Sequence, residues 1–184
     1  MKELLSNEDY IRVQSFLNMI GGKPILIHSQ GNSSGQNKNL NHSQELDLYD
    51  ALLSETTNPI VVLDWDRRVA RIPDKRFFHI PIDFKLSLPE LWLLYTHSAL
   101  LIAIDSGPYH FARMTDIPVL GLWTRNHPAK YALPRDRTFN LVSPYHTGSQ
   151  LTALRGDYFN VVESDLSGCD IACNAVKILE AFNG

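Results

Sequence analysis

The chain has 184 residues, which suits one domain, and 44% of them are hydrophobic and 20% charged. These values are close to globular averages and exclude a disordered, collagen-like or coiled-coil chain. Seventeen Lys and Arg against 20 Asp and Glu give a formal net charge of −3. A general nucleic-acid binder would carry a basic excess, so no nucleic-acid partner is expected. Any anionic ligand must be held by a local site.

No secretory signal and no membrane span are predicted. Met1–Asp9 contains no apolar region, and the longest apolar run, Ser98–Ile104, has the length of a strand. Cys169 and Cys173 are predicted to be buried, reduced thiols, because residues four apart on a helix are poorly placed for a disulfide. We therefore expect a cytoplasmic protein. The histidines do not cluster at ligand spacing, so no metal site is expected.

The predicted elements alternate between helices and strands along the chain. The first helix follows Ser6 as its cap and ends at Gly21-Gly22. Further helices are predicted at 45–53, 87–97, 108–115 and 169–182, and strands at 23–28, 59–64, 77–80, 100–104, 119–123 and 139–142. The alternation predicts a three-layer α/β domain at 23–184 with a mostly parallel sheet, and residues 1–22 form a helix packed on it.

Ligands of such sheets bind beyond the carboxyl ends of the strands. This rule selects three loops, Ser29–Asn41, Asp64–Arg68 and Asp105–His110. In the third loop Gly107 is predicted at the helix cap and Pro108 at the first helical position. The N–H groups around Ser106 and Gly107, with the side chain of His110, then form an anion site suited to phosphate. The alternative, that Asp105 and Ser106 only cap a helix, stays open.

The same segment carries a resemblance to a known family. Asp-Ser-Gly-Pro-x-His-x-Ala starts at Asp105 and is followed by Ile117–Trp123 and His127–Tyr131. This order resembles the C-terminal, nucleotide-sugar-binding half of glycosyltransferase family nine, the heptosyltransferase-like group. The resemblance is densest over 88–134 and extends more loosely back to Lys23. It implies a Rossmann-like nucleotide-sugar-binding domain at 23–184, one half of a two-domain GT-B-type glycosyltransferase.

The resemblance also implies roles for individual residues. The amides of Ser106 and Gly107 would hold the diphosphate of a nucleotide-sugar, with His110 beside it. Lys38 matches the family's lysine in the loop after the first strand, which reaches the donor. Amides and a lysine would neutralise the diphosphate without a metal, so no cofactor is implied beyond the nucleoside-diphosphate-sugar substrate.

Other candidates lie at the ends of neighbouring strands. Asp64 or Asp66, near the end of the second strand, would meet the ribose hydroxyls of the donor. Arg125 follows the strand at 119–123 at the same edge and is a candidate pocket residue, as is Asn126. Trp65 has two interpretations, stacking on a base or packing, and packing is favoured.

The sequence departs from the family pattern in two ways. Leu40 stands where the family has Trp, and about twenty residues precede the first predicted strand. The family's acceptor-binding half, which supplies the catalytic base, is therefore expected to be absent from this chain. An acceptor-binding domain or subunit would have to complete metal-independent glycosyl transfer. The alternative is a non-catalytic module that keeps the fold to bind a nucleotide or a protein.

Two further patterns carry weaker hypotheses. Gly31-x-Ser33-x-Gly35 fits the nucleophile elbow of a serine hydrolase, but the polar stretch at 36–41 lacks the apolar stripe of the helix that an elbow needs. A flexible polar loop is favoured. The basic stretch at 67–76 is predicted to be a solvated loop, because acidic residues interleave with its Arg and Lys.

Overall fold

The computed structural model describes residues 5–32, 38–66, 68–69, 72–132, 135–144 and 160–183. Within these ranges seven strands form one sheet in the order β3-β2-β1-β4-β5-β6-β7. The strands are β1 (Ile25–His28), β2 (Ile60–Leu63), β3 (Phe77–Ile80), β4 (Leu100–Ile104), β5 (Val119–Trp123), β6 (Thr138–Val142) and β7 (Val161–Glu163). All six pairings are parallel. The α/β fold with a parallel sheet, predicted from the sequence, is confirmed.

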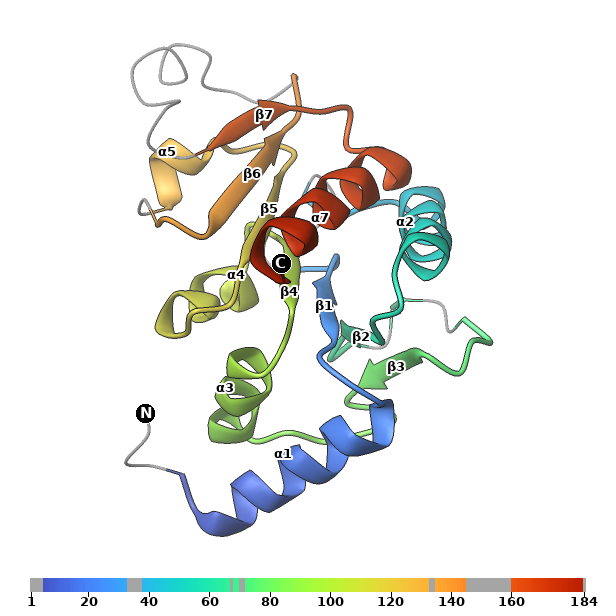
Figure 1. Ribbon diagram of the computed structural model, residues 1–184. Helices are drawn as coiled ribbons and strands as arrows, with labels where there is room; N and C mark the ends of the chain where they lie inside the picture. Colours follow the sequence, from blue (N-terminus) through green and yellow to red (C-terminus); the bar gives the residue numbers. More distant parts are fainter. Residues whose placement is uncertain are drawn as a thin grey trace.

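Helices cover both faces of the sheet (Figure 1). They are α1 (Asn7–Ile20), α2 (His42–Glu55), α3 (Leu88–Thr96), α4 (Gly107–Phe111), α5 (Pro128–Tyr131) and α7 (Gly168–Asn183), with a 3-10 turn, η3, at Ala112–Met114. One core cluster joins α1, α3 and α4 to one face. The other joins α2 and α7, which lie side by side, to the opposite face. The strands β2, β4 and β5 are apolar and fully buried because both of their faces are covered.

The local signals in the sequence set most element boundaries correctly. Ser6 caps α1 and Ser87 caps α3, each in a full capping box with an acidic residue three positions on. Gly21 ends α1 in the left-handed region, at φ 85°, which glycine adopts without steric cost. The buried side chains of α1 pack into the same core as α3, so the first helix is an integral part of the domain.

Three elements differ from the sequence predictions. The edge strand β7 was not predicted; it has only three residues, and Val162 is exposed. The single turn α5 was not among the predicted helices. The helix after β4 begins at Gly107, one residue earlier than predicted, and its α-helical part has five residues before η3. Gly107 is therefore the first helical residue and Ser106 is the cap, because Ser106 is still extended at φ −157° and ψ 174°.

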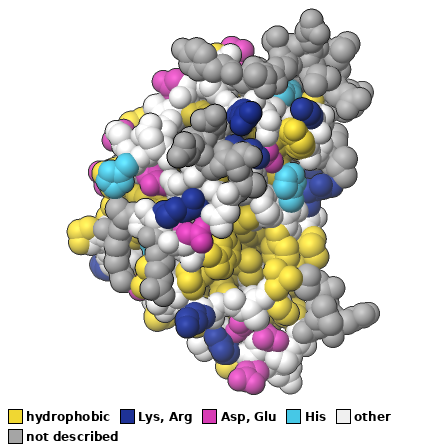
Figure 2. Space-filling view, turned by 180° about the vertical axis from the view of Figure 1, so that it is seen from behind, with side chains coloured by type: hydrophobic (Ala, Val, Ile, Leu, Met, Phe, Trp, Pro, Cys, Tyr) yellow, Lys and Arg dark blue, Asp and Glu magenta, His cyan; other side chains and the backbone are white. Residues whose placement is uncertain are grey.

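Apolar side chains also reach the surface. Figure 2 shows hydrophobic side chains gathered on the face seen from behind Figure 1, with charged groups around them. Ile11, Met19 and Leu88 are among the most exposed large hydrophobic residues. A gathered apolar area is typical of a surface that contacts another protein or domain.

Among the described helices, none combines the length and the apolar character needed to span a bilayer.

Candidate functional site

A cavity of about 310 Å³ opens at the carboxyl edge of the sheet. The strand order reverses between β1 and β4, and a doubly wound sheet binds its ligand at such a reversal. Loops after β1, β2 and β4 supply the walls: His28, Gln30, Gly31, Asn32, Lys38, Trp65, Asp105, Ser106, Gly107 and Pro108. The cavity thus joins residues from the three loops that the sequence selected.

Asp105 is the centre of the polar network in this cavity. Its Oδ2 accepts hydrogen bonds from Lys38 Nζ and from Asn126 Nδ2, both at 3.0 Å. His110 Nε2 lies 3.3 Å from Oδ1. Partial burial by itself would raise the pKa of Asp105, but the hydrogen bonds from Asn126 and Lys38, the Lys38 charge and the His110 contact outweigh it and lower the pKa. Asp105 is therefore an anion that holds Lys38 at the cavity wall.

The backbone at Ser106 and Gly107 is open toward the cavity. Ser106 does not cap α4 with its side chain; its Oγ donates to the Ile104 carbonyl at 3.0 Å instead. A Cβ built at Gly107 would meet no described atom within 4 Å. Pro108 has no N–H, and the His110 amide donates a hydrogen bond to the Ser106 carbonyl within the helix. The first turn therefore offers the amides of Ser106, Gly107 and Tyr109, and a five-residue helix adds little dipole to them.

The loops after β1 and β2 are joined by Arg68. Its guanidinium donates to the Gly31 carbonyl at 3.3 Å and to Asn32 Oδ1 at 2.9 Å, and it pairs with Asp66 at 3.1 Å. Arg68 is exposed and paired with the neighbouring Asp66, as the prediction of a solvated loop with interleaved charges implies, and it also brings the two loops together. Arg67 and Arg71 of the basic stretch lie outside the described residues.

Besides His110 and Asn126, which contact Asp105, three predicted site residues do not line the cavity. Asp64 is buried, and its Oδ2 accepts the Val69 amide at 2.6 Å, so this carboxylate holds the loop after β2. Asp66 is exposed and paired with Arg68. Arg125 is exposed beside Asn126 but is not among the lining residues. The roles predicted for Asp64, Asp66 and Arg125 in donor binding stay predictions.

Trp65 is the clearest residue that the sequence analysis placed wrongly. Its side chain is 45% exposed and forms part of the cavity wall, so the favoured packing interpretation is wrong. The ring centroid lies 5.9 Å from that of His28, which is buried. Burial lowers the pKa of His28, and its Nδ1 lies 2.8 Å from the Leu63 carbonyl. The position of Trp65, one residue beyond Asp64 at the end of β2, was the signal that pointed to the cavity.

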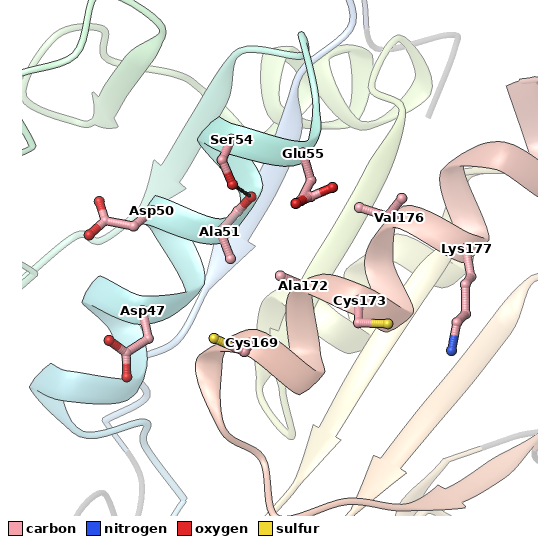
Figure 3. Close-up of a pocket in the computed structure, with 10 residues that line it drawn as sticks. All are labelled: Asp47, Asp50, Ala51, Ser54, Glu55, Cys169, Ala172, Cys173, Val176 and Lys177. Carbon is pink, nitrogen blue, oxygen red and sulfur yellow. Dashed lines mark hydrogen bonds between the residues drawn. The ribbon is translucent and has the colours of Figure 1, made fainter.

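The two cysteines line a second, larger groove between α2 and α7. Cys169 and Cys173 are both exposed, which corrects the prediction of buried thiols. Figure 3 shows their sulfur atoms pointing in different directions, one toward α2 and one toward Lys177. The buried face of α7 is formed by other residues, among them Ile171 and Ala175. In the described part of the chain, no three His, Cys, Asp or Glu side chains are grouped to hold a metal ion.

A doubly wound sheet with a polar cavity at its strand-order reversal is the architecture of a Rossmann-like domain. Comparison with known proteins narrows the class further. Residues 66–155 match the family described as Glycosyltransferase family 9 (heptosyltransferase). This match contains the Asp105–His110 motif and agrees with the family that the sequence suggested. No curated protein matches the chain.

Solved structures show the same fold. A family 9 glycosyl transferase from Veillonella parvula superimposes with a TM-score of 0.65 at 19% identity, over 96% of this chain and 53% of that protein. The ADP-heptose lps heptosyltransferase II of E. coli gives a TM-score of 0.56 at 13% identity, over 96% of this chain and 51% of that protein. The chain thus spans about half the length of the solved relatives.

Proposed function

We propose that this domain binds a nucleoside-diphosphate sugar in the cavity at the reversal between β1 and β4. In this proposal it is the donor-binding half of a heptosyltransferase-like glycosyltransferase. The observation that carries the proposal is the open corner at Ser106 and Gly107, which no described side chain fills, with Lys38 across from it. Backbone N–H groups and a lysine are the groups that proteins use to hold phosphates.

Each wall of the cavity then has one task. The amides of Ser106 and Gly107 receive the diphosphate, and Lys38 shares its charge between Asp105 and a phosphate oxygen. Trp65 offers an exposed ring on which a base stacks, an interaction worth about 1–3 kcal/mol per base. The volume of about 310 Å³ is at the lower end of small-molecule sites, which fits a donor that is only partly enclosed by this chain.

Catalysis in this proposal rests on the departing diphosphate. As the acceptor oxygen bonds to the anomeric carbon of the sugar, the bond between that carbon and the diphosphate breaks. Negative charge then grows on the departing diphosphate, and the amides and Lys38 stabilise that charge without a metal ion. The acceptor and the general base that removes its hydroxyl proton come from an acceptor-binding domain or subunit. Because one solved relative is named for ADP-heptose, ADP and its sugars are the first ligands to test.

The test is isothermal titration calorimetry with ADP, UDP and GDP. We expect the parent to bind at least one of them and Gly107→Val to bind it more than about tenfold more weakly, a loss of ~1.4 kcal/mol. Lys38→Met weakens binding similarly, whereas Lys75→Met, on an exposed turn, does not. Equal binding by the parent and Gly107→Val, or no binding by the parent, contradicts the proposal.

Two alternatives have their own readouts. A non-catalytic binding module predicts that the chain binds a nucleotide or protein but never cleaves an ADP-sugar, even with an acceptor domain present. A serine hydrolase predicts ester cleavage that is lost in Ser33→Ala; Ser33 lies outside the described residues.

A further inference from the structure

We propose that Glu45 is a positioning residue that holds the loop carrying Lys38 in place against Asp105. For its functional meaning the inference rests on the nucleotide site proposed above. Glu45 lies on α2, away from the cavity wall, and the family resemblance assigns it no role.

The carboxyl group of Glu45 is buried on the apolar face of α2. Only 3% of the residue is exposed, and the neighbouring inward-facing residues of α2 are Leu48, Tyr49 and Leu52. Burial raises its pKa, while hydrogen bonds from Gln30 and Ser29 oppose that shift. A polar group in such a place is costly unless it is hydrogen-bonded, so its partners indicate what it does.

Its hydrogen-bond partners Ser29 and Gln30 both belong to the start of the loop after β1. Ser29 Oγ and Gln30 Nε2 each donate to Glu45 Oε1 at 2.6 Å. Helix capping does not explain the carboxyl group, because Gln44, not Glu45, closes the capping box of α2 with Asn41. The side chain of Glu45 therefore serves the loop and not its own helix.

The same loop is tied at its far end. Gln30 Nε2 also donates to the Leu40 carbonyl at 2.9 Å, and the Leu40 amide donates to the Ser29 carbonyl at 3.2 Å. The Gly31 amide donates to Asn39 Oδ1 at 2.9 Å. Glu45 thus fixes Gln30, and Gln30 in turn joins the two ends of the loop.

Lys38 is the residue that this arrangement positions. It lies two residues before Leu40, and its side chain is 18% exposed and paired with Asp105 at 3.0 Å. Lys38 and Asp105 come from loops after two different strands, so their pairing requires the first loop to close at its base. Without the Glu45 carboxyl, Gln30 loses one of its two acceptors and the loop gains freedom at the point where it closes.

The first experiment needs no ligand. Lysine acylation with acetic anhydride, followed by mass spectrometry, measures how freely Lys38 leaves Asp105. We expect Lys38 to react about five- to tenfold faster in Glu45→Leu and in Gln30→Ala than in the parent, as the loss of a charged hydrogen bond implies. Glu45→Gln keeps an acceptor and restores the parent rate, and Glu55→Leu, an exposed change at the end of α2, leaves it unchanged. An unchanged Lys38 rate in Gln30→Ala, a change at a half-buried side chain, overturns the inference.

The second experiment asks whether Glu45 acts through Lys38. If it does, Glu45→Leu weakens ADP binding in the parent but not when Lys38→Met is already present, because neighbours in one network are not additive. Equal weakening in both backgrounds contradicts positioning and indicates a general structural effect. Faster Lys38 acylation with no ADP binding by the parent supports the role of Glu45 in the loop and removes the proposed function.

Discussion

Gly121, in the centre of β5, lies where three buried side chains meet. A Cβ there would lie 2.6 Å from Asn140 Oδ1, 2.7 Å from the Tyr109 ring and 2.8 Å from Trp123 Nε1. Asn140 Oδ1 accepts hydrogen bonds from Trp123 Nε1 at 2.7 Å and from the Tyr109 hydroxyl at 3.1 Å. Gly121→Ala must therefore displace this network, and with it Tyr109, which anchors α4 next to the cavity.

The expected cost follows from these contacts. Overpacking a core typically costs about 1–3 kcal/mol, and weakening a buried hydrogen bond adds about 1 kcal/mol. We expect a loss of ~2–4 kcal/mol in the free energy of unfolding, which at about 2–4 °C per kcal/mol lowers Tm by roughly 5–15 °C. Urea unfolding and calorimetry measure both values.

The control is another glycine of the same domain. Gly107→Ala adds the same methyl group where no described atom lies within 4 Å, so its stability should stay within the ~0.5 kcal/mol typical of surface changes. If Gly121→Ala is as stable as Gly107→Ala, the reasoning from close contacts is refuted.

Two further predictions concern charge and thiols. The folded-state pKa of Asp105 is lowered, so its contribution to stability is present above the unfolded value of 3.8 and is lost as pH falls through the folded value. Lys38→Met removes one of the causes that lower the pKa of Asp105. The difference in unfolding free energy between parent and variant should therefore shrink as pH falls below 3.8. A difference that does not change with pH would contradict an origin in the Lys38–Asp105 pair. Cys169 and Cys173 are exposed, so both should react with Ellman's reagent in the native protein as fully as in urea; fewer than two reactive thiols in the native state would contradict their exposure.

Local sequence signals were sufficient for most of the fold. The signals that set the helix ends and the strands act over only a few residues, as the caps Ser6 and Ser87 and the stop at Gly21 show. They can therefore be recognised in the sequence without knowledge of tertiary contacts. Because helices and strands alternate along the chain, a parallel sheet with helices on both faces is the arrangement that buries the strands. The Asp105–His110 motif was found because it directly follows such a strand.

Tertiary structure alone decided which residues meet at the site. Lys38 and Asp105 are 67 positions apart, and Glu45 reaches back to Gln30 from a different element, so no spacing in the chain reveals either contact. The position of Trp65 at the end of β2 indicated the edge of the sheet where it lies, but its exposure was decided by the tertiary structure, because burial depends on what packs over a side chain and not on its identity. Sequence fixes the short-range preferences of the backbone, whereas the long-range contacts that build a binding site exist only after the strands have been brought side by side.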